Sequence, residues 1–278
     1  MRRRSDAMRH ATCLMAVGLT LAGAVTRADD ALPPEPKVSK ARGWNDQRRT
    51  VRSYGRNLWG NVLAVPKSSN HRSLLIVGAL AAPSFAWDEE VVGYFERHPN
   101  QQFADIGSAM GGAIAIGGVG VGLFAIGRVS HGDRFRAMTY DLSQAIIVTQ
   151  LYTTALKLVV RRERPDASNQ LSFPSGHASN AFTFAGVVGK HYGPRAEAVG
   201  YAVASYIALS RCAANKHHFS DVFAGAGLGL VIGRSVARRN GRPPGSADGA
   251  APRTFEIAFA PDAGPSGDGS GARLRVAF

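Results

Sequence analysis

The sequence contains few cysteines. Of its 278 residues only Cys13 and Cys212 carry a thiol, and Cys13 lies in an N-terminal apolar stretch that we expect to be removed. Cys212 then has no partner within the chain, which excludes an intramolecular disulfide even in an oxidising compartment. We expect Cys212 to be a buried free thiol.

Acidic residues are also scarce. Asp and Glu number 20 against 33 Lys and Arg, which gives a formal net charge of +13 and a pI near 10.4. A basic chain favours anionic partners such as phosphate esters, anionic lipids or nucleic acids, although a solubilising surface charge produces the same balance. Because an apolar run directly follows the basic N-terminal residues, we predict no nucleic-acid partner.

Apolar runs of membrane-spanning length are rare. A span needs about 20 apolar residues, and of the segments after the N-terminal stretch only 106–127 reaches that length, with eight glycines among its residues. Asp141 and Lys157 interrupt the segment 139–160. We therefore expect no full set of membrane spans. Either 106–127 and 139–160 alone cross, which places the site predicted below on the periplasmic side, or no segment crosses.

The N-terminal residues have the pattern of an export signal. MRRRSDAMRH is basic, ATCLMAVGLTLAGAV is apolar, and Thr26-Arg27-Ala28 resembles a small-residue cleavage site. We predict a signal peptide at 1–28, with an uncleaved anchor as the alternative, and hence an exported, periplasmic protein with possible membrane association. Residues 29–72 are predicted to be a polar linker followed by an amphipathic segment.

A series of Ala-rich apolar segments follows, without the alternation of strands. They are separated by short polar breaks and lie at 73–87, 106–127, 139–160, 178–189, 198–210 and 222–233. Gly193-Pro194 predicts a turn between two of the expected helices. We predict an all-α fold, a helical bundle of about six helices over 73–239 with the active site at one end. Residues 240–278 are predicted to form a linker and a short C-terminal β-hairpin-like tail, because apolar residues alternate in RTFEIAFA and ARLRVAF.

Two clusters of polar residues lie at the ends of these expected helices. In KLVVRRERP, Lys157 closes an apolar helix, and Arg164 precedes the proline that stops it. In FPSGHASN, Ser175 fits an N-cap, and Gly176 lets a ligand approach the first N–H groups of the next helix, which form a ready anion site. His177 falls in the first turn of that helix. Each cluster alone is equally typical of an ordinary helix end.

The third cluster is SRCAANKHHFSD, residues 210–221. His217 and Asp221 are four residues apart, so they share a face if a helix starts by residue 217. A carboxylate on one ring nitrogen fixes the tautomer and leaves the other nitrogen free as a nucleophile. His218 would then point elsewhere. Because adjacent loops at one end of a bundle converge, the three clusters together predict one pocket with three cations, Lys157, Arg164 and Arg211.

These clusters resemble the signature motifs of a known family. K-x6-R-P at 157–165, P-S-G-H at 174–177 and S-R-x5-H-x3-D at 210–221 are similar, at every fixed position and in the same order, to those of the type 2 phosphatidic acid phosphatase / vanadium haloperoxidase superfamily. The resemblance covers 157–221 directly, and the apolar bundle from 73 to 236 is similar in layout.

The resemblance implies a phosphatase that needs no metal or cofactor. Its substrate would be a phosphate monoester or diphosphate of a lipid, of the phosphatidate or polyprenyl diphosphate type. By resemblance, His217 attacks phosphorus and forms a phosphohistidine, Asp221 orients His217, and His177 protonates the leaving oxygen. The phosphate-binding residues would be Lys157, Arg164, Ser175, Gly176 and Arg211.

Several alternatives stay open. A soluble periplasmic acid phosphatase of broad specificity would use the same residues, and a vanadate-dependent haloperoxidase would hold vanadate in the same place. A non-enzymatic scaffold would leave the three motifs without a function. A zinc site at His217, His218 and Asp221 is disfavoured by the three neighbouring cations. The sequence predicts neither the oligomeric state nor the identity of the substrate.

Overall fold

A computed structural model describes residues 48–241, 256–261 and 272–277 of the chain. The signal peptide predicted at 1–28 and the first part of the linker predicted at 29–72 lie outside these residues. So does most of the linker within 240–278.

The described part of the chain is dominated by α-helices, as the sequence predicts. In chain order they are α2 Tyr54–Ala64, α3 Ser68–Ser84, α4 Asp88–Arg97, α5 Gln101–Gly111, α6 Ala113–Val129, α7 Asp133–Val160, α8 Gly176–Tyr192, α9 Pro194–Ala213 and α10 Phe219–Gly241. A short 3₁₀ turn, Phe85–Trp87, joins α3 to α4. The prediction of an all-α bundle is confirmed, and the amphipathic segment before it contains α2.

Two details of the helix prediction are wrong. The segment 106–127, predicted as one helix, is broken at Gly112, whose backbone is extended (φ −63°, ψ 148°), and the helices on either side meet at a 43° bend. Helix α4 was not predicted because its first turn carries three acidic residues. A search for apolar runs passes over such a helix, although acidic residues stabilise a helix N-terminus.

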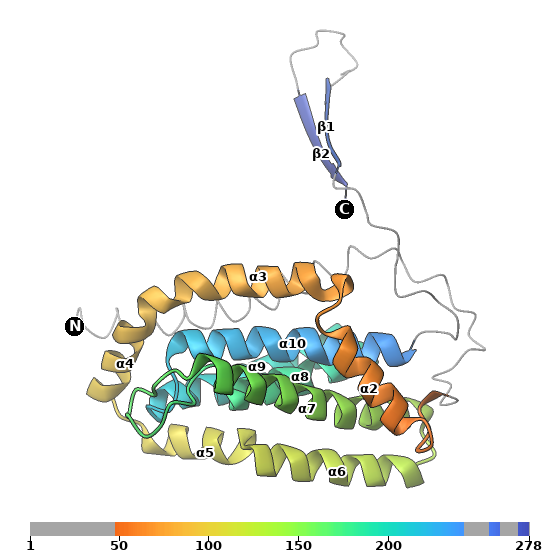
Figure 1. Cartoon of the computed structure of the whole chain (residues 1–278), viewed down its shortest axis with the longest axis horizontal. Coiled ribbons are helices and arrows are strands. Elements are labelled where there is room, and N and C mark those ends of the chain that lie inside the picture. Colours follow the sequence, from red (N-terminus) through yellow and green to blue (C-terminus); the bar gives the residue numbers. More distant parts are fainter. Residues whose placement is uncertain (1–47, 242–255, 262–271, 278) are drawn as a thin grey trace.

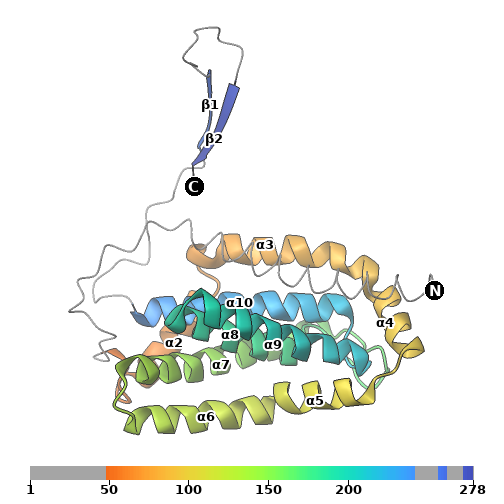
Figure 2. The same ribbon diagram turned by 180° about the vertical axis from the view of Figure 1, so that it is seen from behind.

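The helices form layers around α7, α8 and α10. Figures 1 and 2 show α3 along one side of this central group and α5 with α6 along the opposite side. Helices α8 and α9 lie behind α7 and α10 in Figure 1 and in front of them in Figure 2. Helices α7 and α8 run in opposite directions, as do α9 and α10, so the C-terminal ends of α7 and α9 meet the N-terminal ends of α8 and α10.

Glycines bring α8 and α10 unusually close. Gly225, Gly229 and Gly233 are spaced by four residues and therefore lie on one face of α10. A Cβ atom on Gly229 would stand 2.0 Å from the carbonyl oxygen of Ser179 on α8, and one on Gly233 would stand 2.6 Å from that of Thr183. The glycine stripe thus fixes how α10 lies on α8, and with it the relative position of the two N-termini.

Two smaller predictions are confirmed. Gly193, with φ +89°, separates α8 from α9, and Pro194 is the first residue of α9, which is the position that proline favours. Cys212 is a fully buried free thiol, and burial raises the pKa of this thiol above its usual range.

The predicted C-terminal hairpin is also present as a pair of strands. β1, Glu256–Pro261, pairs antiparallel with β2, Ala272–Ala277. Ile257 lies opposite Val276 and Phe259 opposite Leu274, which matches the alternation read from the sequence.

Candidate active site

The predicted site residues lie where four helix ends meet. Lys157 is in the last turn of α7 and Arg211 in the last turn of α9. Ser175 caps α8 and accepts from the N–H of Ala178, as predicted. The backbone N–H of Ser175 donates to the carbonyl of Asp221 at 2.9 Å, which joins the start of α8 directly to the first turn of α10.

Three cations converge on this point. Burial, and then the charge of Arg164, lowers the pKa of Lys157 to about 8, and the same two causes lower the pKa of Arg211. The buried Nε atoms of Arg164 and Arg211 have no hydrogen-bond partner among the described residues. Mutual repulsion and unsatisfied donors are costly in a folded protein. A bound anion would relieve both.

His177 lies in the first turn of α8, beside these cations. Burial, and then the charge of Arg211, lowers the pKa of its ring to about 4. Its Nε2 is 3.1 Å from the backbone carbonyl of Ser108 at the end of α5. A Cβ atom on Gly111 would stand 2.8 Å from the His177 ring, so α5 packs directly against it.

His217 is almost completely buried, with 2% of its surface exposed. Burial, followed by the charges of Lys157, Arg164 and Arg211, holds its pKa well below the usual range. The imidazole is therefore neutral at pH 7 and keeps a lone pair on one nitrogen. Its Nδ1 lies 3.9 Å from Oδ2 of Asp221.

The condition under which His217 and Asp221 would share a helix face, a helix that starts by residue 217, is not met. Helix α10 begins at Phe219, so His217 lies in the connection before it rather than on the helix. Asp221 is in the first turn of α10, and its Oδ2 accepts from the backbone N–H of His218 at 2.9 Å. It thus acts as a capping carboxylate as well as the neighbour of His217.

His218, the second histidine of the pair, lies differently. Its Nε2 is 3.3 Å from the backbone carbonyl of Glu163. His217 is instead the ring whose charge state depends on Lys157, Arg164 and Arg211. The geometry therefore separates the two neighbouring rings, as the spacing in the sequence suggests.

Sequence reasoning missed the residues that hold Asp221. Arg162 Nη1 donates to Oδ1 of Asp221 at 2.7 Å, and Ser172 Oγ donates to Oδ2 at 2.5 Å. Arg162 also donates to Asp88 at 2.7 Å, and Asp88 accepts from both the backbone N–H and the hydroxyl of Ser220. Asp88, Arg162 and Ser172 therefore fix the position of Asp221.

Ser108 was missed as well. Its hydroxyl accepts a hydrogen bond from Nη1 of Arg211, and its carbonyl faces His177. Through Ser108, α5 contacts both side chains, so this helix orients a predicted phosphate ligand and a predicted acid together. The small residues around it, in GSAMGG, were the only available signal, because they let α5 approach α8 and α9 closely.

Metal coordination finds no support in the side chains. Among the described residues, no group of three or more His, Cys, Asp and Glu side chains is arranged to hold a metal ion. Beside the carboxylate of Asp221, His217 has three cations around it, Lys157, Arg164 and Arg211, which would repel a divalent cation.

Comparison with known proteins identifies the family. Residues 139–242 match the family model of the PAP2 superfamily. These residues belong to the PAP2 superfamily. The resemblance read from the motifs is thereby confirmed for residues 139–242, which include all eight predicted site residues.

Several curated PAP2-type relatives are similar over part of their length. A lipid A 1-phosphatase of Porphyromonas gingivalis is 41% identical over 75 residues, covering 26% of this chain and 17% of the relative. A PA-phosphatase related-family protein of Dictyostelium discoideum is 32% identical over 41% of this chain and 51% of its own length. A decaprenylphosphoryl-5-phosphoribose phosphatase of Mycobacterium tuberculosis is 34% identical over 32% and 54% respectively.

The chain therefore spans about half or less of each of these relatives. Among solved structures, the crystal structure of a transmembrane PAP2 type phosphatidylglycerolphosphate phosphatase from Bacillus subtilis aligns over 66% of this chain and 92% of its own. The TM-score is 0.33 and the identity 19%, so this alignment adds nothing to the family assignment. Asp88 and Ser108 lie outside the PAP2 match, although both contact its residues.

Proposed function

We propose that the chain is a metal-independent phosphatase that hydrolyses a phosphate monoester or diphosphate of a lipid through a phosphohistidine. The observation that carries this proposal is the convergence of three cations and two neutral histidines on one point, with unsatisfied donors on Arg164 and Arg211. A tetrahedral phosphate, with negative charge on several oxygens, satisfies all of them.

In the first step the neutral ring of His217 attacks phosphorus, and an N–P bond forms as the bond to the leaving oxygen breaks. Lys157, Arg164 and Arg211 hold the phosphoryl oxygens, where negative charge is spread in the transition state. The first N–H groups of α8, at Gly176 and after it, face the same charge. Asp221 compensates the positive charge that develops on His217.

His177 supplies the proton for the leaving oxygen. In the unliganded site its pKa is about 4, so the ring is neutral at pH 7. A phosphate dianion bound to the three cations offsets their charge and raises the pKa of His177, which lets the ring take up the proton that it then donates. In the second step His177 removes a proton from water, the water oxygen attacks phosphorus, and the N–P bond breaks to release phosphate.

A lipid substrate is supported by the surface and by the relatives. Several large apolar side chains are strongly exposed on α3, α6 and α7, among them Leu75, Ile114, Val121, Val129 and Val159. Because α3 and α6 lie on opposite sides of the bundle (Figure 1), these side chains belong to separate surfaces, and contiguous apolar surfaces mark membrane or partner contacts. Two of the relatives are named as phosphatases of lipid A and of a decaprenyl-linked phosphoribose.

Membrane association is part of the proposal, either by a spanning helix or by contact with the bilayer surface. In the described residues α10 is long and apolar enough to cross a bilayer, but it is buried inside the bundle, as a core helix is. The bent pair α5 and α6 passes the same test if it is counted as one span. We propose a periplasmic location on the basis of the export signal, which cell fractionation would test.

The decisive experiment measures phosphate release from phosphatidate, a polyprenyl diphosphate and a soluble aryl phosphate, all with EDTA present. Wild type is expected to release phosphate and to form an acid-labile phosphoenzyme, and His217→Ala to do neither. His131→Ala, which removes an exposed histidine elsewhere, is the matched control and should match wild type. Activity in His217→Ala, or loss of all wild-type activity in EDTA, would refute the proposed mechanism.

The His218→Ala variant tests which ring is the nucleophile. It should form the phosphoenzyme as wild type does, because its ring faces Glu163. A His218→Ala variant that forms none, beside a His217→Ala variant that does, would reverse the assignment.

A further inference from the structure

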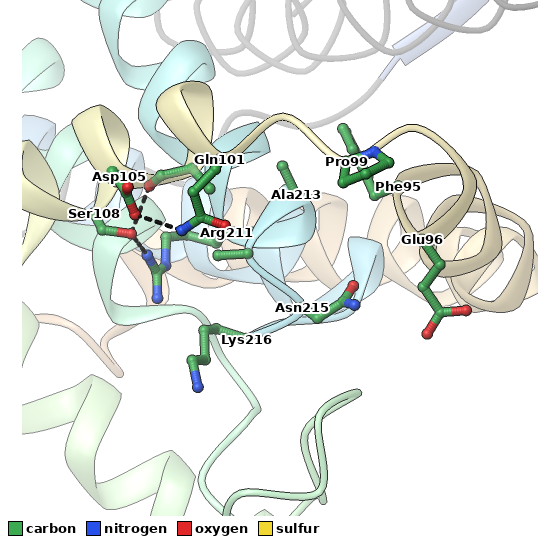
Figure 3. A pocket seen from close by; sticks show the side chains of 12 residues that line it. Phe95, Glu96, Pro99, Gln101, Asp105, Ser108, Arg211, Ala213, Asn215 and Lys216 are labelled. Carbon is green, nitrogen blue, oxygen red and sulfur yellow. Dashed lines mark hydrogen bonds between the residues drawn. The ribbon is translucent and has the colours of Figure 1, made fainter.

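A pocket adjoins the candidate active site on the side of α4 and α5. It has a volume of about 470 Å³, within the range of roughly 300–1,000 Å³ typical of small-molecule sites. Its walls come from the end of α4, from α5, and from the end of α9 with the connection that follows it, residues 211–216 (Figure 3). The sequence motifs do not account for it, since α4 and α5 lie outside them.

The pocket shares two residues with the phosphate site. Arg211 lines it, and so does Ser108, whose hydroxyl accepts from the Arg211 guanidinium. A phosphate held by Arg211 would therefore stand at the inner end of the pocket. The group attached to that phosphate would be next to the open volume.

The lining combines acceptors and donors of opposite charge. Glu96 and Asp105 contribute carboxylates, and Gln101 and Asn215 contribute amides. Arg211 and Lys216 contribute two positive charges, and Lys216 is also ion-paired with Asp166. Because the lining carries charges of both signs, it lacks the uniform field that would attract a second phosphate or an ammonium group.

Several of these polar groups have capacity left for a ligand. Asp105 accepts from Gln101 at 2.8 Å through Oδ1, and a carboxylate oxygen pair has about four acceptor positions. The buried Oδ1 of Asn215 has no hydrogen-bond partner among the described residues. Phe95 and Pro99 supply an apolar wall opposite. Closely spaced hydroxyls on a carbon ring match this mixture, since each hydroxyl both donates and accepts.

We propose that the pocket binds the alcohol part of the phosphate ester, and that this part is a neutral, polyhydroxylated group of the sugar type. The inference rests on the proposed phosphatase function and narrows its substrate class. The sugar phosphate would be either free or attached to a lipid. Its ring would pack against Phe95 while its hydroxyls meet Asp105, Gln101 and Asn215.

The experiment compares kcat/KM for four substrates: glucose 1-phosphate, butyl phosphate, phosphoethanolamine and a lipid-linked sugar phosphate. We expect a sugar phosphate to exceed butyl phosphate and phosphoethanolamine at least fivefold. A higher kcat/KM for the lipid-linked sugar phosphate than for glucose 1-phosphate identifies the substrate as lipid-linked. Equal kcat/KM values identify it as the free sugar phosphate. Both results support the inference.

Variants locate the preference in the pocket. Asp105→Ala, on an exposed part of α5, should lower the ratio of sugar phosphate to butyl phosphate at least fivefold. Ala214→Phe, which fills the pocket from its wall, should lower the same ratio. Asp133→Ala removes an exposed acid at the start of α7, at the far end of the bundle, and should leave the ratio unchanged.

Failure of this inference is distinguishable from failure of the proposed function. If His217 is needed for hydrolysis of butyl phosphate but the enzyme shows no preference for a sugar phosphate, the pocket assignment alone is overturned. The same holds if neither pocket variant changes the ratio of kcat/KM for sugar phosphate to that for butyl phosphate. A preference for phosphoethanolamine overturns it in favour of a cationic group. Absence of hydrolysis for every substrate overturns both.

Discussion

The two ends of the helical bundle each bury an aspartate beside an arginine and a histidine. At the end described above, Asp221 accompanies Arg162 and His217. Asp141 lies on α7 at about 24 Å from Lys157, by the rise of an α-helix. It accepts two hydrogen bonds from Arg49 at 2.9 and 2.8 Å and lies 2.9 Å from Nε2 of His191. Asn240 donates to the same carboxylate at 2.9 Å.

The two networks differ in what they leave unsatisfied. Around Asp141 the arginine is matched by the carboxylate in a bidentate pair, the geometry that gives the strongest hydrogen bonds. Around Asp221 the histidine is 3.9 Å away, and nearby buried nitrogens of Arg164 and Arg211 have no partner in the described chain. The same residue types therefore close one end of the bundle, while the other keeps unpartnered donors among the described residues, where we propose that phosphate binds.

The largest expected effect tests the open end. Arg211→Ala should lower kcat/KM about 10²- to 10³-fold, because it removes one preorganised donor from the transition state. The free energy of unfolding should stay the same or rise, since a repelling cation is lost. Steady-state kinetics and chemical unfolding in the same buffer measure the two quantities.

The counterpart at the closed end is Arg49→Ala. Removing one partner of a buried pair leaves Asp141 as an uncompensated charge, and the free energy of unfolding should fall by about 3–5 kcal/mol. Below the unfolding transition kcat should stay within about twofold of wild type. An Arg49→Ala protein as stable as wild type would show that the two ends do not differ in the way described.

A smaller effect is expected where α4 supports the open end. Asp88→Asn removes the charge that holds Arg162 and Ser220, so Asp221 should lose its fixed position. We expect kcat to fall about tenfold, the lower end of what loss of such outer hydrogen bonds costs, with KM little changed. Glu89→Gln, at the exposed neighbouring position, is the control. A rise in KM alone would assign Asp88 to substrate binding instead.

The last expected effect concerns stability and its dependence on pH, and not catalysis. Folding lowers the pKa of His177 from 6.5 to about 4 and holds that of His217 well below its usual range, so the unfolded chain binds more protons. The contribution of the neutral His177 ring to the free energy of unfolding is therefore fully present above pH 6.5. It is lost as the pH falls towards 4, and it amounts to at most about 3 kcal/mol. His177→Asn should flatten the dependence of the unfolding midpoint on pH in this window. An unchanged slope would contradict the depressed pKa.

Local patterns in the sequence predicted much of the fold. Ala-rich segments indicated the helices of the bundle, Gly193 and Pro194 indicated the turn between α8 and α9, and alternation indicated the two C-terminal strands. The break at Gly112 was not predictable, because the residues on both sides of it are equally apolar and favour a continuous helix. Helix α4 was missed for the opposite reason, since few of its residues are apolar.

The site was predictable as far as it lies on motifs. Lys157, Arg164, Ser175, His177, Arg211, His217 and Asp221 are close together in the sequence or share a recognised spacing, and the structure brings them to one end of the bundle. Asp88 and Ser108 carry no such signal. Their partners are 132 and 103 residues away, and a hydrogen bond over that separation leaves no local periodicity.

The sequence by itself determined the residue types of the site, their order and the helical class of the fold, because these depend on short-range spacing and on helix-end chemistry. Only the tertiary structure decided that both buried aspartates are held by hydrogen bonds, while Arg164 and Arg211 keep buried nitrogens without a partner among the described residues. It also decided that α10 starts after His217 and that α5 places Ser108 against both Arg211 and His177. The physical reason is that hydrogen-bond saturation and close helix packing depend on all the elements around a group and not on its neighbours in the chain.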